Sequence, residues 1–156
     1  MAHLARVLSC GFASAAALFV LAPTAFAEPA ESEVPKACSG SAPTRGGGAA
    51  DYESCIYIYD GALRAYGSLT SKTGSSTIPD CTMVVTIIDT DPDASGASGG
   101  VIATSGQMPC VNGNYPSPPL TVEKGKVQAG HGYASYTEVT LNNQGVGRMC
   151  SPELRP

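Results

Sequence analysis

Three carboxylates spaced two residues apart are the first side chains in this sequence that could do chemistry. Asp89, Asp91 and Asp93 directly follow an apolar run. Carboxylate oxygens that converge at the end of a strand are ligands that a hard cation such as Ca²⁺ prefers. The EF-hand loop pattern fails, because Ala94 stands where that loop needs glycine and Gly100 where it needs glutamate. Bound calcium is therefore one hypothesis for the three aspartates, and an acidic turn in water is the other.

A histidine and a serine motif raise the question of catalysis. His131 is the one histidine beyond residue 27 and could serve as a general base, but it lies between two glycines and no nucleophile can be assigned to it. Residues 96–100 match Gly-x-Ser-x-Gly. That motif needs a strand before it and a helix after it, whereas here a Pro- and Asp-containing segment precedes it and a β-branched residue follows. A small extracellular hydrolase is therefore poorly supported.

Tyrosines and one arginine could form a binding surface. Tyr57, Tyr59, Arg64 and Tyr66 alternate with aliphatic residues and should share one face of a hairpin. Tyrosine and arginine are enriched at binding hot spots, and tyrosine rings can also stack on sugar rings. The other interpretation is that a second sheet or the N-terminal segment covers these side chains as ordinary sandwich packing.

The segment 107–116 suggests a different function. It is stiffened by prolines and contains Cys110, which could anchor it through a disulfide. Rigid, anchored loops are what protease inhibitors present, because preorganisation lowers the entropic cost of binding. A secreted protease inhibitor is therefore the alternative function, while a long connection at one end of a sandwich is the structural explanation.

The first 27 residues predict a cleavable secretory signal. Arg6 lies in a short first region, an apolar run covers 12–22, and residues 25–27 form a small-x-small cleavage site. The apolar run is shorter than the roughly 20 residues that span a bilayer. We therefore expect a secreted protein, extracellular or at the cell surface, with no membrane span in the mature chain.

Cysteine usage agrees with export. The expected mature chain contains five cysteines, at wide spacings and without a CxxC pair: Cys38, Cys55, Cys81, Cys110 and Cys150. Zinc sites usually bring two ligands within a few residues of each other, so a zinc site is not indicated. In an oxidising compartment the pattern predicts two disulfides and one remaining cysteine, with the pairing left open.

The charge of the chain limits its partners. There are 9 Lys and Arg residues against 13 Asp and Glu, a formal net charge of −4, and the basic residues are scattered along the sequence. Nucleic acid and anionic membranes need clustered Lys and Arg, so neither is expected as a partner. An extracellular protein or a polysaccharide remains the expected partner, and no cofactor is expected apart from the possible Ca²⁺.

Turn residues and alternation predict an all-β fold. Residues 28–50 are rich in Pro, Gly and Ser, which is typical of a flexible leader, here pinned at Cys38. Residues 51–156 form the single expected domain. Asp60-Gly61 is a favoured two-residue hairpin turn, and it places Tyr59 opposite Ala62 and Ile58 opposite Leu63.

Further strands complete the predicted domain. We expect strands at 82–88, 101–104 and 133–141, a second hairpin at 120–129 around Lys124-Gly125, and a tail over 147–156 held by Cys150. No helical periodicity extends over ten residues beyond the signal. The sequence therefore predicts a small, disulfide-supported antiparallel β-sandwich, immunoglobulin-like or related, or a barrel. Its expected function is non-catalytic binding or a structural role at the surface.

Overall fold

The computed structural model describes residues 34–44, 50–72, 77–91, 99–111 and 119–156. Residues 1–33, which include the predicted signal, lie outside this part, as do Asp93, Ser98 and residues 112–116 of the segment 107–116. The described residues between Val34 and Pro156 belong to one compact unit. The fold below is therefore the fold of that unit.

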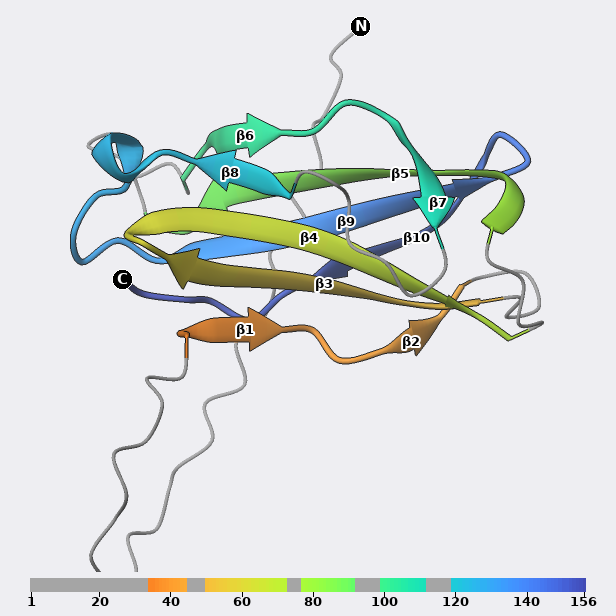
Figure 1. Cartoon of the computed structure of the whole chain (residues 1–156), viewed down its shortest axis with the longest axis horizontal. Helices are drawn as coiled ribbons and strands as arrows, with labels where there is room; N and C mark the ends of the chain where they lie inside the picture. The colour runs from red at the N-terminus through yellow and green to blue at the C-terminus, as the bar shows by residue number, and fades with distance from the viewer. Residues whose placement is uncertain (1–33, 45–49, 73–76, 92–98, 112–118) are drawn as a thin grey trace, which may run out of the picture. The chain divides into compact units, whose positions relative to one another are not determined.

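Two antiparallel sheets make up the domain, which confirms the predicted all-β fold (Figure 1). Sheet A has the order β1 (Lys36–Cys38), β3 (Ala50–Tyr59), β4 (Ala62–Ser71), β8 (Leu120–Val122), and β2 (Ala42–Pro43) also pairs with β3. Sheet B has the order β10 (Gln144–Cys150), β9 (Tyr133–Leu141), β5 (Thr77–Asp89), β6 (Val101–Thr104), and β7 (Met108–Val111) also pairs with β5. A short 3₁₀ helix, η1 (Lys124–Lys126), follows β8.

The β3–β4 hairpin has the register that its sequence predicts. Tyr59 pairs with Ala62 and Ile58 with Leu63 across the turn. Asp60 and Gly61 have φ values of 52° and 71°, as a two-residue turn with two left-handed positions requires. Turn chemistry and hydrophobic alternation agree here, so the register is fixed locally.

The core lies between the sheets in two apolar clusters, each built from the inner faces of both. One cluster consists of Ala50, Tyr52, Leu69, Cys81, Met83, Cys110 and Val139. The other consists of Ile56, Leu63, Ala65, Val85, Ile87, Val122 and Tyr133.

A layer of hydroxyls separates the two clusters. Ser54 Oγ lies 3.0 Å from both Ser135 Oγ and Thr137 Oγ1, and all three residues are fully buried. A Cβ at Gly67 would come within 2.5 Å of the Thr137 methyl group, so glycine is needed where sheet A crosses this threonine. The hydroxyls satisfy one another and join the sheets without leaving a buried polar group unpaired.

Two predicted elements differ from the structure. Part of the segment 28–50 is not a leader, because β1 and β2 extend sheet A along β3.

The prediction of a hairpin over 120–129 is wrong. β8 instead pairs with β4, which places Val122 opposite Leu63, and backbone hydrogen bonds from Lys126 to Glu123 and from Val127 to Lys124 form η1. Burial of Val122 in the core favours the long-range pairing over the local one.

The structure selects the disulfide pairing. Cys38 is bonded to Cys55 and Cys81 to Cys110, and Cys150 takes part in neither bridge. The sequence predicts a C-terminal tail held by Cys150, but no disulfide forms at this cysteine within the described part of the chain. An antiparallel bridge between Tyr133 and Leu154 fixes it instead.

Among the residues that the structure describes, no helix is long and apolar enough to cross a membrane.

Candidate functional site

The outer face of sheet A carries the four residues predicted to form a binding surface. Inward-facing Ile56 leaves the odd-numbered residues of β3 on the outside, and the register places Lys36, Tyr57 and Arg64 in one row across three strands. We call Lys36, Tyr57, Tyr59, Arg64 and Tyr66 the aromatic–cationic surface. The structure brings all four predicted residues together and adds Lys36, which sequence reasoning missed because it had placed that residue in a flexible leader.

Two cations lie over tyrosine rings in this surface. Arg64 Cζ is 4.7 Å from the centroid of Tyr59, and Lys36 Nζ is 5.2 Å from the centroid of Tyr66. Tyr57 and Tyr66 meet edge to face, with centroids 6.1 Å apart. Tyr66 is only 6% exposed, as ordinary packing would have it, whereas Tyr59 is 52% exposed, and binding at this face stays a prediction. Within the surface, Lys36 and Tyr59 are exposed, Tyr57 and Arg64 are half-buried, and Tyr66 is buried.

Arg64 has no carboxylate partner within the part of the chain that the structure describes. Its Nε is buried and makes no hydrogen bond, and its guanidinium stacks on Tyr59. The Lys124 side chain lies beside Gly61, at the turn that ends the same hairpin. Arg64 and Lys124, which are far apart in the sequence, therefore both lie near this end of sheet A, where the turn also carries the exposed Asp60.

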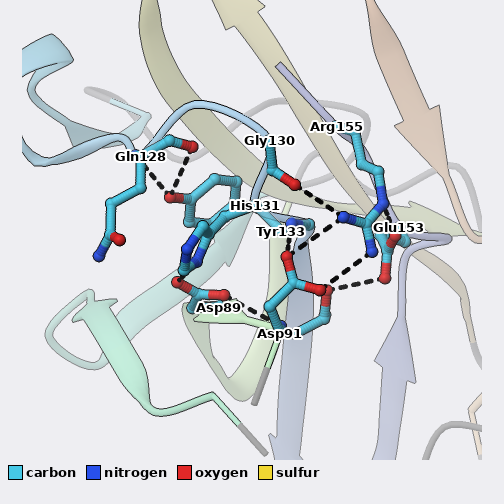
Figure 2. Close-up of polar contacts among 10 residues, drawn as sticks. Asp89, Asp91, Gln128, Gly130, His131, Tyr133, Glu153 and Arg155 are labelled. Carbon is cyan, nitrogen blue, oxygen red and sulfur yellow. Dashed lines mark hydrogen bonds and ion pairs between the residues drawn. The ribbon is translucent and has the colours of Figure 1, made fainter. Parts of the chain in front are cut away.

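A second polar cluster, which we call the C-terminal clasp, contains Asp89, Asp91, His131, Glu153 and Arg155 (Figure 2). It joins the end of β5, the loop before β9 and the C-terminal tail. Sequence reasoning found the two aspartates and the histidine but missed Glu153 and Arg155. In the sequence, the tail shows only that Glu153 and Arg155 carry opposite charges two residues apart, and this does not indicate which residues they contact.

Asp91 binds the tail with both carboxylate oxygens. Arg155 Nη2 and Nη1 donate to Oδ1 and Oδ2 at 3.1 Å each, and the Gly132 N–H donates to Oδ2 at 2.8 Å. The hydrogen bonds from Arg155, and then that from Gly132, hold the pKa of Asp91 below its ordinary value of 3.8. Arg155 also pairs with Glu153, which accepts a hydrogen bond from Thr90 at 2.7 Å.

Asp89 is engaged in the same way. Its Oδ2 lies 2.8 Å from His131 Nδ1, and its Oδ1 accepts the Asp91 N–H at 3.0 Å. A cation at the two aspartates would have to displace Arg155 and these other donors. Calcium binding at Asp89 and Asp91 therefore stays a prediction that the hydrogen bonding does not favour, and the third proposed ligand, Asp93, lies outside the described residues.

The Asp89–His131 pair resembles part of a hydrolytic site but lacks a nucleophile. Among described residues, no hydroxyl or thiol is hydrogen bonded to the imidazole, whose ring instead packs beside Tyr133 with centroids 6.5 Å apart. Tyr133 is fully buried and its hydroxyl accepts the Gln128 N–H at 2.8 Å (Figure 2). These contacts orient the loop before β9, so the arrangement supports a structural role for the clasp.

The segment considered for protease inhibition is anchored at its base. Cys110 is bonded to Cys81 of β5, and Pro109 pairs with Thr82 in the sheet. Residues 112–116 of the segment lie outside the described part, and protease inhibition stays a prediction.

Comparison of the chain with family models, with curated proteins and with solved structures yields no match.

Proposed function

We propose that this chain is a secreted, non-catalytic domain that binds an acidic extracellular polysaccharide through its aromatic–cationic surface. The observation that carries the proposal is the Arg64 guanidinium, which stacks on the exposed ring of Tyr59 and has no carboxylate partner among the described residues. Guanidinium groups bind carboxylates with two parallel hydrogen bonds, and the stacking holds this one in place.

The surface has the chemistry of a ligand that combines rings with sparse negative charge. Tyr59 offers an aromatic ring covered by Arg64, and the Lys124 side chain lies beside Gly61 in the adjoining turn. The net charge of −4 opposes long-range attraction to a densely charged polymer such as nucleic acid. A uronic-acid polymer fits better, because its charge density is lower than that of duplex DNA and its charged groups are carboxylates, which guanidinium binds with two parallel hydrogen bonds.

A protein partner fits the surface less well. Stable protein interfaces cover about 800 Å² on each side and have an apolar centre. The exposed end of this surface instead presents one tyrosine and charged side chains. Secretion is supported by the N-terminal sequence and by two disulfides, which persist in oxidising compartments.

Retention on immobilised polysaccharide tests the proposal. The protein lacking residues 1–27 should be retained on polygalacturonate at low salt, be released as salt rises, and pass through neutral dextran. Arg64→Gln should weaken binding about tenfold, or about 1.4 kcal/mol. Arg148→Gln on the outer face of sheet B is the matched control and should bind like the wild type. Equal retention on both polymers, or an unchanged Arg64→Gln variant, would contradict the proposal.

The Cys81–Cys110 bridge supports one other candidate, protease inhibition through segment 107–116. A disulfide at the base of a loop reduces the entropy lost when a protease binds it. Titration of the protein into secreted serine proteases should then give stoichiometric inhibition that a Cys81→Ser/Cys110→Ser variant loses. Full protease activity at equimolar protein would exclude this candidate, and cleavage at one peptide bond would mark the protein as a substrate.

A further inference from the structure

A polar hollow of about 440 Å³ lies on sheet B, away from both the aromatic–cationic surface and the C-terminal clasp. It is lined by Asp80, Thr82, Gln107, Thr140, Asn142 and Asn143. Its volume falls within the roughly 300–1,000 Å³ typical of small-molecule sites. Such sites are mostly apolar, whereas every residue that lines this hollow is polar.

Sheet register builds two sides of the hollow. Thr82 of β5 lies directly opposite Thr140 of β9, so the two side chains share the outer face of sheet B. Asn142 and Asn143 form the β9–β10 turn with φ values of 49° and 60°. The Asn142 N–H donates to the Asp80 carbonyl at 3.0 Å, which fixes the turn against the start of β5.

The third side is fixed by a side-chain hydrogen bond and a disulfide. Gln107 Nε2 donates to Thr82 Oγ1 at 2.8 Å. Three residues further on, Cys110 is bonded to Cys81, the neighbour of Thr82. The backbone of the walls is therefore fixed before a ligand binds, which lowers the entropic cost of binding.

The free hydrogen-bonding capacity of the lining indicates the ligand class. Within the described part of the chain, the side chains of Asp80, Thr140, Asn142 and Asn143 make no hydrogen bond or ion pair. The lining offers amide donors and acceptors, hydroxyls and one carboxylate, but no cation and no large apolar side chain. An apolar ligand would find little surface to bury, and Asp80 would repel an anion.

We propose that this hollow is a binding site for a neutral saccharide unit. Several hydroxyls on a small rigid ring match a wall of amides and hydroxyls, because each can donate and accept hydrogen bonds at once. This goes beyond the function proposed above and does not depend on it. The two surfaces lie at opposite ends of the domain, since the β9–β10 and β3–β4 turns are at opposite ends of the sheets (Figure 1).

Nuclear magnetic resonance titration tests the site directly. The probes are cellobiose, maltose and chitobiose, each added to the ¹⁵N-labelled protein without residues 1–27. At least one probe should shift the backbone amides of residues 80–82, 107 and 140–143 in a saturable way. A second titration compares two single sugars, glucose and glucuronate. Glucuronate should bind more weakly than glucose, because its carboxylate has a charge of the same sign as Asp80.

Two pairs of variants separate the hollow from the rest of the molecule. Asn143→Gly keeps the left-handed turn while removing the amide, and Thr140→Ala removes a hydroxyl. Each should weaken binding at least about fivefold. Thr104→Ala, on the same outer face, and Thr70→Ala, at an exposed position of β4 on sheet A, should bind the probe like the wild type. The proposal is overturned if no probe shifts these amides, if both hollow variants bind normally, or if glucuronate binds more tightly than glucose.

Discussion

An arginine lies over a tyrosine ring on the outer face of each sheet, and the two pairs differ in one neighbour. On sheet B, Arg148 Cζ is 3.8 Å from the centroid of Tyr136, and its Nε is 3.3 Å from the carboxylate of Glu138. On sheet A, Arg64 covers Tyr59 but contacts no described carboxylate. The same stack is neutralised on one face and retains its positive charge on the other.

Register explains the difference. Each arginine lies diagonally across the strand pair from the tyrosine that it covers. The residue directly opposite Arg148 is Glu138, whereas the residue directly opposite Arg64 is Tyr57. A single cross-strand position thus determines whether the guanidinium has an internal partner. The comparison suggests that an unpaired arginine stack, held in a sheet, is what makes the outer face of sheet A suitable for an acidic ligand.

Reversal of the charge at Arg64 should have the largest effect. Arg64→Glu removes the cation and adds a repulsive carboxylate, so affinity for polygalacturonate should fall at least about 30-fold. Arg148→Glu, which places the same charge on the other face, should leave binding unchanged. Binding constants from biolayer interferometry check this, with circular dichroism to confirm the fold. Equal losses in both variants would show that net charge, rather than the stack, determines binding.

Placing a carboxylate beside Arg64 should also lower the affinity for polygalacturonate, but by less than reversing the charge of Arg64 itself. Thr121 is exposed and lies opposite Arg64 on β8, so Thr121→Glu would give Arg64 the neighbour that Arg148 has. We expect affinity to fall about tenfold, because the internal carboxylate competes with the ligand. Thr121→Gln is the uncharged control and should bind normally. If the glutamine variant loses as much affinity as the glutamate variant, the shape of β8 matters and the competition argument fails.

The hairpin that carries Arg64 could be predicted because its determinants are local. Asp60-Gly61 specifies the turn, and alternation on both sides specifies the face, so no distant residue is needed. The expected hairpin at Lys124-Gly125 fails for the opposite reason. Its strand pairs with Leu63, far away in the sequence, and the buried position of Val122 is visible only in the folded chain.

The candidate sites show the same limit. Asp89 and Asp91 were recognisable from their spacing, but the donor that engages Asp91 is Arg155, 64 residues further along the chain. Lys36 joined the tyrosines only once β1 had paired with β3, next to the Cys38–Cys55 bridge. Spacing in the sequence thus identifies the side chains that can do chemistry. Whether a partner already occupies them depends on contacts between distant segments.

A third arginine, Arg155, is paired with Asp91, and this pair predicts how the stability of the fold depends on pH. The pKa of Asp91 is lowered in the folded protein, so this aspartate stabilises the fold above its unfolded pKa. That contribution is lost as the pH falls through the lowered folded value. Asp91→Asn should therefore be less stable than the wild type at pH 7, and the two stabilities should converge as the pH falls below the ordinary aspartate pKa of 3.8. Urea unfolding across this range measures it, and a constant difference at all pH values would refute the linkage.

The smallest effect on stability is expected from removing the carboxylate of Glu138, which pairs with Arg148 on sheet B. The side chains of Arg148 and Glu138 are 50% and 49% exposed, so Glu138→Gln should reduce the free energy of unfolding by no more than about 0.5 kcal/mol. The same change leaves the stack on Tyr136 with its positive charge unpaired, which is the arrangement found on sheet A. In an Arg64→Gln background it should therefore restore weak, salt-sensitive retention on polygalacturonate. If the double variant passes through the column unretained, an unpaired arginine on a tyrosine is not sufficient, and the additional cations Lys36 and Lys124 become part of the requirement.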